Sequence, residues 1–215
     1  NYRKLSEKSL QLLLIKRGEH PYLGQWALPG GFVSMDESLE EAAQRELKGE
    51  TGIDDLYMEQ LFTWGDGGRD PRTRVIGCSY MALADRGALD IRAGDDAEDA
   101  RWFEVTYRVV QEKKNVQADG YEFERLIKIT LTNGTEQLMS TVKLTTVYAG
   151  RSKRVYREVV ESQGLAFDHA KIIEYAIERL RNKIEFTDIA FHLMPPLFTL
   201  SSCSRFMKLF LAKSC

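Results

Sequence analysis

Acidic side chains recur at fixed spacing between Gly31 and Ile53. Glu46 and Glu50 are four residues apart, so a helix places both carboxylates on one face. Hard oxygen ligands of this kind suit Mg²⁺, which keeps several waters and can hold a diphosphate while activating a water. Gly49, just before Glu50, adds no side chain to this face. The spacing therefore predicts a magnesium and phosphate site built on two carboxylates, with plain surface charges as the alternative.

A single helix is expected to carry these groups. Ser38 is a capping residue, and Glu41 follows three residues later, as in a capping box. Gly52 is the expected stop. The turn Leu28-Pro29-Gly30-Gly31 precedes the helix and interrupts any strand before it. The apolar stripe of the helix consists of Leu39, Ala42, Ala43 and Leu47.

The remaining elements predict an α+β fold. Stretches of strand length and composition lie at 9–15, 26–28, 56–64, 75–84 and 100–105. Asn133-Gly134 is the strongest two-residue hairpin signal and predicts that 125–132 pairs with 136–147, while the rest of 106–163 is less regular. A long amphipathic helix is expected from Phe167 to about Asn182, with Asp168 as its cap and its apolar residues on one face.

Composition restricts the class of protein. A content of 43% hydrophobic and 29% charged residues is typical of a globular protein with a real core. The absence of an 18-residue apolar run and the polar first residues argue against a membrane span or signal peptide, so the cytoplasm is the expected compartment. Three cysteines without ligand spacing support neither a disulfide framework nor zinc. Residues 151–215 carry 11 Lys and Arg against 7 Asp and Glu, which suits either an anionic partner or an ordinary solvated surface.

The stretch from Gly31 to Ile53 resembles the Nudix box. Glu37 follows Gly31 after five residues, and Arg45-Glu46-Leu47-x-Gly49-Glu50-x-Gly52-Ile53 follows after seven more. Every defined position matches except Gly49, where the family pattern has Glu. The resemblance implies a Nudix fold with a mixed sheet between helices. It also implies a remnant catalytic site of Glu46 and Glu50 with Glu37 and Arg45, and Mg²⁺ bound weakly or not at all.

Longer segments resemble the Nudix-related transcriptional regulators of NAD metabolism. These are "KRGEHPYLGQWALPGGF", "GRDPRTRVIGCSYMALAD", "AGDDAEDARWF", "LAFDHAKIIEYAIERLR", "FTDIAF" and "PPLFTL". The resemblance implies a Nudix-like ligand-binding domain over 1–183 and a partial winged helix-turn-helix, expected to be incomplete, over 184–215. The expected function is an ADP-ribose-responsive repressor of NAD-metabolism genes that binds double-stranded operator DNA as a homodimer. A hydrolase acting on ADP-ribose or a related nucleoside diphosphate derivative is the alternative.

The same resemblance suggests contact residues. Arg17, Arg69 and Arg72 are candidate partners of the diphosphate, above a pocket floor that includes Leu28, Gly30 and Gly31. Trp26 and Phe62 are candidates to stack on adenine, with core packing as the alternative for both. The candidate DNA-binding residues are Thr187, Thr199, Ser201 and Ser202.

Two segments depart from the regulator pattern. Residues 106–163 exceed a usual connection, and we expect an inserted hairpin at the rim, where it touches the ligand, a partner subunit or DNA, or is a subfamily elaboration. Residues 203–215 do not resemble the expected next helix. Codons can be chosen for these residues that, read one base out of frame, encode LQQVYEAIFSKEL, which has helical apolar spacing. We therefore hypothesise a frameshift, which the nucleotide sequence of the gene would test.

Overall fold

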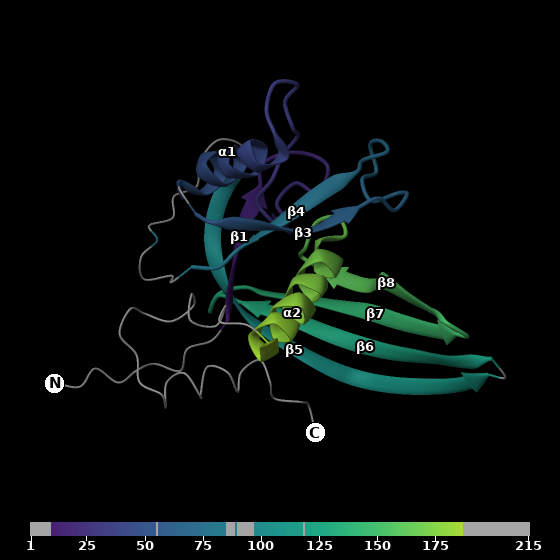
Figure 1. Cartoon of the computed structure of the whole chain (residues 1–215). Coiled ribbons are helices and arrows are strands. Elements are labelled where there is room, and N and C mark those ends of the chain that lie inside the picture. The colour runs from purple at the N-terminus through teal and green to yellow at the C-terminus, as the bar shows by residue number, and fades with distance from the viewer. Residues whose placement is uncertain (1–9, 55, 85–88, 90–96, 118, 187–215) are drawn as a thin grey trace.

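The computed structural model describes residues 10–54, 56–84, 89, 97–117 and 119–186 (Figure 1). A six-stranded sheet has the order β2-β1-β5-β6-β7-β8, and β3 and β4 form a separate two-stranded sheet. The predicted DNA-binding residues, and nearly all of the expected domain over 184–215, lie outside the described residues. The elements are β1 (Gln11–Arg17), β2 (Trp26–Ala27), α1 (Leu39–Thr51), β3 (Met58–Trp64), β4 (Gly77–Ala82), β5 (Ala97–Gln117), β6 (Gly120–Thr132), β7 (Gln137–Ala149), β8 (Ser152–Gln163) and α2 (His169–Phe186).

The predicted boundaries of α1 are confirmed. The Ser38 hydroxyl accepts the Glu41 amide at 3.2 Å, and the Glu41 carboxylate accepts the Ser38 amide at 2.8 Å. Gly52 has φ 74°, a left-handed conformation that favours glycine, and its amide bonds the Lys48 carbonyl at 2.8 Å. Local sequence therefore fixes both ends of the helix that carries Glu46 and Glu50.

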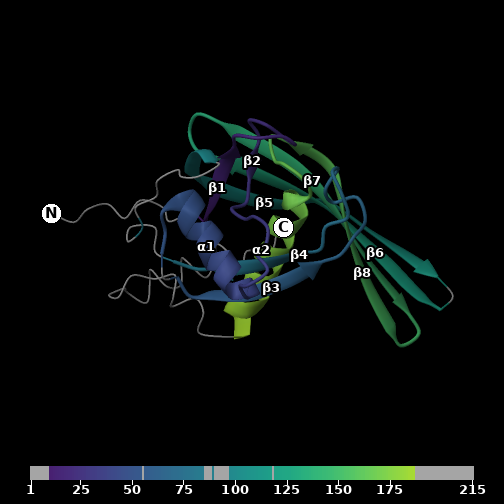
Figure 2. The same cartoon turned by 90° about the horizontal axis from the view of Figure 1, so that it is seen from above.

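The segment from 106 to 163 is more regular than predicted. The Asn133-Gly134 hairpin is confirmed, because β6 pairs antiparallel with β7 from Gly120–Ala149 to Thr132–Gln137. However, β5 continues through 21 residues to Gln117, and β8 adds a further strand beside β7. The segment therefore extends the main sheet instead of inserting one hairpin, and its four strands project past α2 in Figure 2.

The α+β class is confirmed, although the sheet is less mixed than expected. Every strand pairing in the described ranges is antiparallel, and the parallel element is an isolated bridge between Trp26 and Leu165. The large side chains that are completely buried in the main core come from β1, β5, β6 and β7, namely Leu14, Phe103, Ile127, Ile129, Leu131 and Val142, and α2 adds Ala170.

Helix α2 is covered on two sides, not on the single face predicted. Ile173 and Ile177 belong to the core of the large sheet, whereas Ile172 packs with Leu61 and Trp64 of β3. In Figure 1, α2 crosses the sheet beneath β3 and β4. The helix begins at His169 instead of Phe167, and the carboxylate of the expected cap Asp168 bonds Arg69. No described helix is long and apolar enough to cross a membrane.

Candidate functional site

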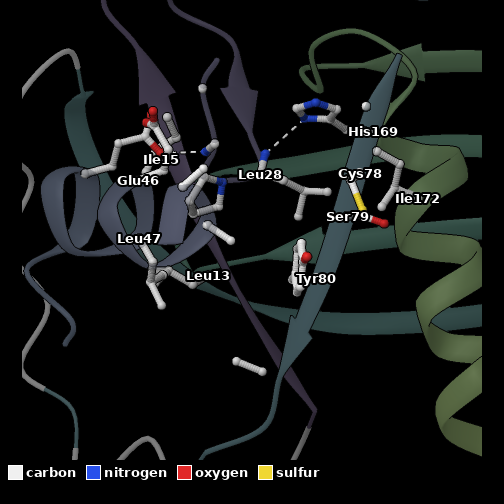
Figure 3. Close-up of a pocket in the computed structure, with 18 of the residues that line it drawn as sticks. Leu13, Ile15, Leu28, Glu46, Leu47, Cys78, Ser79, Tyr80, His169 and Ile172 are labelled. Carbon is white, nitrogen blue, oxygen red and sulfur yellow. Dashed lines mark hydrogen bonds between the residues drawn. The ribbon is translucent and has the colours of Figure 1, made fainter. Parts of the chain in front are cut away.

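A cavity of about 1120 Å³ lies between α1, β1, β4 and the start of α2. Figure 3 shows Glu46 and Leu47 on the α1 side and His169 and Ile172 on the α2 side, with Tyr80 between them. The lining combines aliphatic and aromatic groups with charged ones, which suits a ligand that has both an apolar ring and an anionic part. The charged lining residues include Arg17, Glu46, Glu50, Arg69 and Arg72.

Arg45 holds the motif carboxylates in place. Its Nε and Nη2 donate to the two oxygens of Glu37 at 2.9 and 2.6 Å, and its Nη1 donates to Glu46 at 2.6 Å. Nη2 also reaches the Phe32 carbonyl at 3.0 Å. The hydrogen bonds from Arg45 lower the pKa of Glu37 to about 2, so Glu37 is ionised throughout the physiological range. The predicted set of Glu37, Arg45 and Glu46 is thus brought together.

Glu50 ties α1 to the turn before it. Its side chain is buried, and its Oε2 accepts the Gly30 amide at 2.7 Å. A Cβ at Gly31 would stand 2.3 Å from Oε1 of Glu46, so a larger residue there would displace this carboxylate from its present position. Leu28, Gly30 and Gly31 all line the cavity. The predicted floor therefore lies against both glutamates.

The donor set accommodates Mg²⁺ only in part. Glu46 and Glu50 line the same cavity from one helix face, and carboxylates are ligands that Mg²⁺ uses. Within the described ranges, however, no three His, Cys, Asp or Glu side chains are grouped so as to hold a metal ion. The two carboxylates fit an ion that takes its other ligands from water and ligand phosphates.

The three predicted arginines all line the cavity. Arg69 forms a bidentate pair with Asp168, in which Nε and Nη2 donate to the two carboxylate oxygens at 2.8 and 3.0 Å. Arg72 is paired with Asp70 at 2.7 Å. Arg17 donates to the Pro21 carbonyl at 2.8 Å. Their predicted role toward a diphosphate stays a prediction, which this placement permits.

Neither predicted stacking aromatic lines the cavity. Trp26 is 3% exposed and packs edge-on against Phe103, so it is a core residue, as the alternative held. Phe62 packs on Trp64 and Tyr175 and does not itself line the cavity. Residue type alone suggests stacking for both, whereas the strand register decides which face a side chain occupies. The cavity is lined by other aromatics, which are Phe32, Trp64, Tyr80, Trp102 and Phe167.

No pattern in the sequence assigns a site role to His169 or to its neighbours. His169 lines the cavity, and its Nδ1 accepts the Leu28 amide at 2.9 Å, so the neutral ring carries its proton on Nε2 (Figure 3). Asp168 and Phe167 line the cavity too. Their partners lie 99 or more residues away in the sequence, so no local pattern indicates these contacts.

Acidification is expected to destabilise the fold through His169. Burial lowers its pKa to about 4 from an ordinary 6.5, and the nearby Asp168 opposes this shift only partly. Because the folded pKa is the lower one, stability is complete above pH 6.5 and falls as pH drops toward 4, by up to about 3 kcal/mol. Urea unfolding of wild type and His169→Asn from pH 7 to 4.5 measures this. The Asn variant should lose less stability over that range, and parallel curves would contradict the assignment.

Residues 5–125, more than half of the chain, match the NUDIX domain. The chain belongs to the NUDIX family. It is 28% identical over 209 residues to the ADPR responsive transcriptional repressor NtrR of Acinetobacter baylyi, which covers 96% of this chain and 62% of that protein. It is also 38% identical over 122 residues to the ADP-ribose pyrophosphatase of Methanocaldococcus jannaschii, covering 57% of this chain and 66% of the relative. The chain thus spans somewhat under two thirds of the length of these curated relatives.

Solved structures agree with this membership. A MutT/nudix family protein from Enterococcus faecalis has a TM-score of 0.69 at 29% identity, covering 96% of this chain and 68% of that one. NrtR from Shewanella oneidensis, crystallised with a 27mer DNA, has a TM-score of 0.59 at 26% identity, covering 96% and 71%. The expected Nudix fold is confirmed, with the long β5–β8 sheet attached to it.

Proposed function

We propose that this chain belongs to an ADP-ribose-responsive repressor that binds operator DNA of NAD-metabolism genes and uses its Nudix domain as the sensor. One observation carries the proposal. The Nudix cavity keeps Glu46, Glu50 and its arginines, while Gly49 removes a carboxylate that hydrolysis would use. A cavity that binds but turns over slowly is suited to sensing. Similarity to an ADPR responsive repressor along 96% of the chain supports this reading.

The DNA-binding part is proposed for 184–215, with Thr187, Thr199, Ser201 and Ser202 facing DNA. The Shewanella protein of similar fold was crystallised with DNA. Because α2 lines the cavity at its start and runs toward this segment, it is the proposed mechanical link. Half-site recognition usually requires two-fold symmetry, so we propose a homodimer, acting in the cytoplasm with the DNA.

A DNA titration tests the function. ADP-ribose is expected to weaken operator binding by about 5 to 150-fold, the range of a coupling between two sites of one protein. Arg72→Ala should abolish this response and leave DNA affinity in the absence of ligand nearly unchanged, because Arg72 is half-exposed at the cavity, where it pairs with Asp70 and lies over the ring of Phe32. Fluorescence anisotropy of labelled operator with the full-length natural protein measures both effects.

The matched control is Arg74→Ala, which removes an arginine from the same loop outside the cavity lining. This variant should respond to ADP-ribose like the wild type. Equal dissociation constants with and without ADP-ribose would contradict the sensor function. Equal loss of response in both variants would show that Arg72 acts through the loop and not as a ligand contact.

Hydrolysis of ADP-ribose is the second candidate. Glu46 and Glu50 still share one helix face, and Mg²⁺ often binds through one or two carboxylates together with substrate phosphates. The Methanocaldococcus relative is an ADP-ribose pyrophosphatase. We propose that any such activity here is slow and that Mg²⁺ binds weakly, since Gly49 supplies no ligand.

A further inference from the structure

The three residues that lead into α2 each contact a different part of the cavity wall. Phe167 lies under the Arg17 guanidinium, 5.0 Å from its ring centroid. Asp168 bonds Arg69, and the His169 ring accepts the Leu28 amide. A ligand in the cavity therefore competes with, or adds to, contacts that fix the first turn of α2.

Arg69 lies in the loop between β3 and β4 and contacts both strands. Its Nη1 donates to the Trp64 carbonyl at 3.2 Å, at the end of β3. Gly77, the first residue of β4, makes room for the guanidinium, because a Cβ there would stand 2.7 Å from Nη1. The arginine side chain is 11% exposed. The guanidinium thus has one hydrogen bond, to β3, that does not involve Asp168.

Asp168 occupies the open side of this guanidinium. Its two oxygens take the parallel Nε and Nη2 donors, which is the fork geometry that arginine offers equally to carboxylates and to phosphate oxygens. Asp168 directly precedes α2, whereas the Trp64 carbonyl that also binds Arg69 belongs to β3. An anionic ligand group that reached Arg69 would take the same two donors.

We propose that Arg69 is an anion receptor whose occupant alternates between Asp168 and a phosphate of the ligand, so that filling the cavity releases the first turn of α2. The proposal rests on the proposed function and deepens it, because it names the contact through which ligand binding reaches the helix that leads toward the DNA-binding segment. Coupling requires that the ligand bind the two states with different affinity, and competition with Asp168 for Arg69 supplies that difference.

A neighbouring ion pair provides a matched comparison. Lys171, in the same first turn, bonds Asp66 of the same loop as Arg69. Neither Lys171 nor Asp66 lines the cavity. Removing the Asp66 carboxylate loosens the same turn without freeing a cavity arginine. Asp168→Asn and Asp66→Asn therefore separate competition for Arg69 from general loosening of α2.

Calorimetric titration with ADP-ribose, and separately with inorganic pyrophosphate, tests the exchange. Asp168→Asn should bind both about fivefold or more tighter than wild type, because its competitor is neutral, whereas Asp66→Asn should match wild type within about twofold. Equal or weaker binding by a folded Asp168→Asn would overturn the proposal. So would equal tightening in Asp66→Asn.

Hydrogen exchange of the wild-type chain gives a second test that needs no variant. ADP-ribose should speed amide hydrogen exchange at 169–172, whereas a ligand that only fills the cavity would slow it. Slower hydrogen exchange would overturn the proposed alternation at Arg69.

If wild type binds ADP-ribose but Asp168→Asn binds no tighter, only this inference fails. If pyrophosphate shows the tightening and ADP-ribose does not bind, the proposed ligand fails and the exchange stands. If neither ligand binds either protein, both fail.

Discussion

Replacing Arg157 by leucine is expected to lower the free energy of unfolding by about 3–5 kcal/mol, the cost of leaving a buried charge without its partner. Glu174 of α2 is fully buried, and Arg157 of β8 donates to it from Nε at 2.7 Å. The Tyr107 hydroxyl also donates to that carboxylate at 3.3 Å, as a weaker neutral donor. Burial raises the pKa of Glu174 even with Arg157 present, which shows how strongly desolvation opposes its ionised form. Urea unfolding at pH 7 measures the loss.

Two variants make this result specific. Arg157→Leu combined with Glu174→Leu should recover most of the loss, because a buried ion pair replaced by apolar residues is often neutral. Arg154→Leu removes an exposed arginine from the same strand and should change stability by less than about 0.5 kcal/mol. A loss below about 1 kcal/mol in Arg157→Leu would mean that water or Tyr107 compensates Glu174.

This ion pair gives the 106–163 segment a definite structural role. Arg157 also bonds Glu178, and Arg125 of β6 reaches Glu178 at 3.2 Å, so two strands of the segment grip the middle of α2. The segment, predicted to lie at the rim, instead supplies strands against which α2 packs.

Local features of the sequence were predictable because their causes are local. The capping box of Ser38 and Glu41 and the stop at Gly52 act within one helical turn, and the structure has both. The Asn133-Gly134 hairpin is of the same kind. The glycine turn predicted as the pocket floor lines the cavity, with Gly31 beside Glu46 of the motif helix.

Non-local features were missed for equally physical reasons. The outer half of β5 contains Gln111, Glu112, Lys113, Lys114 and Asn115, so no apolar alternation marks it as strand. Its pairing with β6 makes it one. The contacts of Arg69 with Asp168 and of Leu28 with His169 join residues that only the finished fold brings together. The choice of Trp26 for stacking failed because β2 turns that ring toward Phe103.

Gly49→Glu is expected to raise Mg²⁺-dependent hydrolysis of ADP-ribose by about 100-fold, since a restored metal ligand is worth a few kcal/mol at about 1.4 kcal/mol per tenfold in rate. The new carboxylate would stand three residues after Glu46 and next to Glu50, and these two glutamates line the cavity. Phosphate release from ADP-ribose, coupled to a phosphatase that acts on the products, measures the rate. The unmodified chain should be slower than an active family member by about the same factor.

The gain must come from the carboxylate and not from the helix. Gly49→Gln removes the glycine, which is worth up to about 1 kcal/mol of helix stability, but adds no charge, so it should stabilise the fold without raising the rate. Glu46→Gln added to Gly49→Glu should abolish the gain, because the new ligand needs its neighbour on the same ion. Ordinary turnover by the unmodified chain would show that Glu46, Glu50 and substrate phosphates already hold the metal. In that case Gly49 would not indicate a loss of hydrolytic activity, and hydrolysis would replace sensing as the function of this cavity.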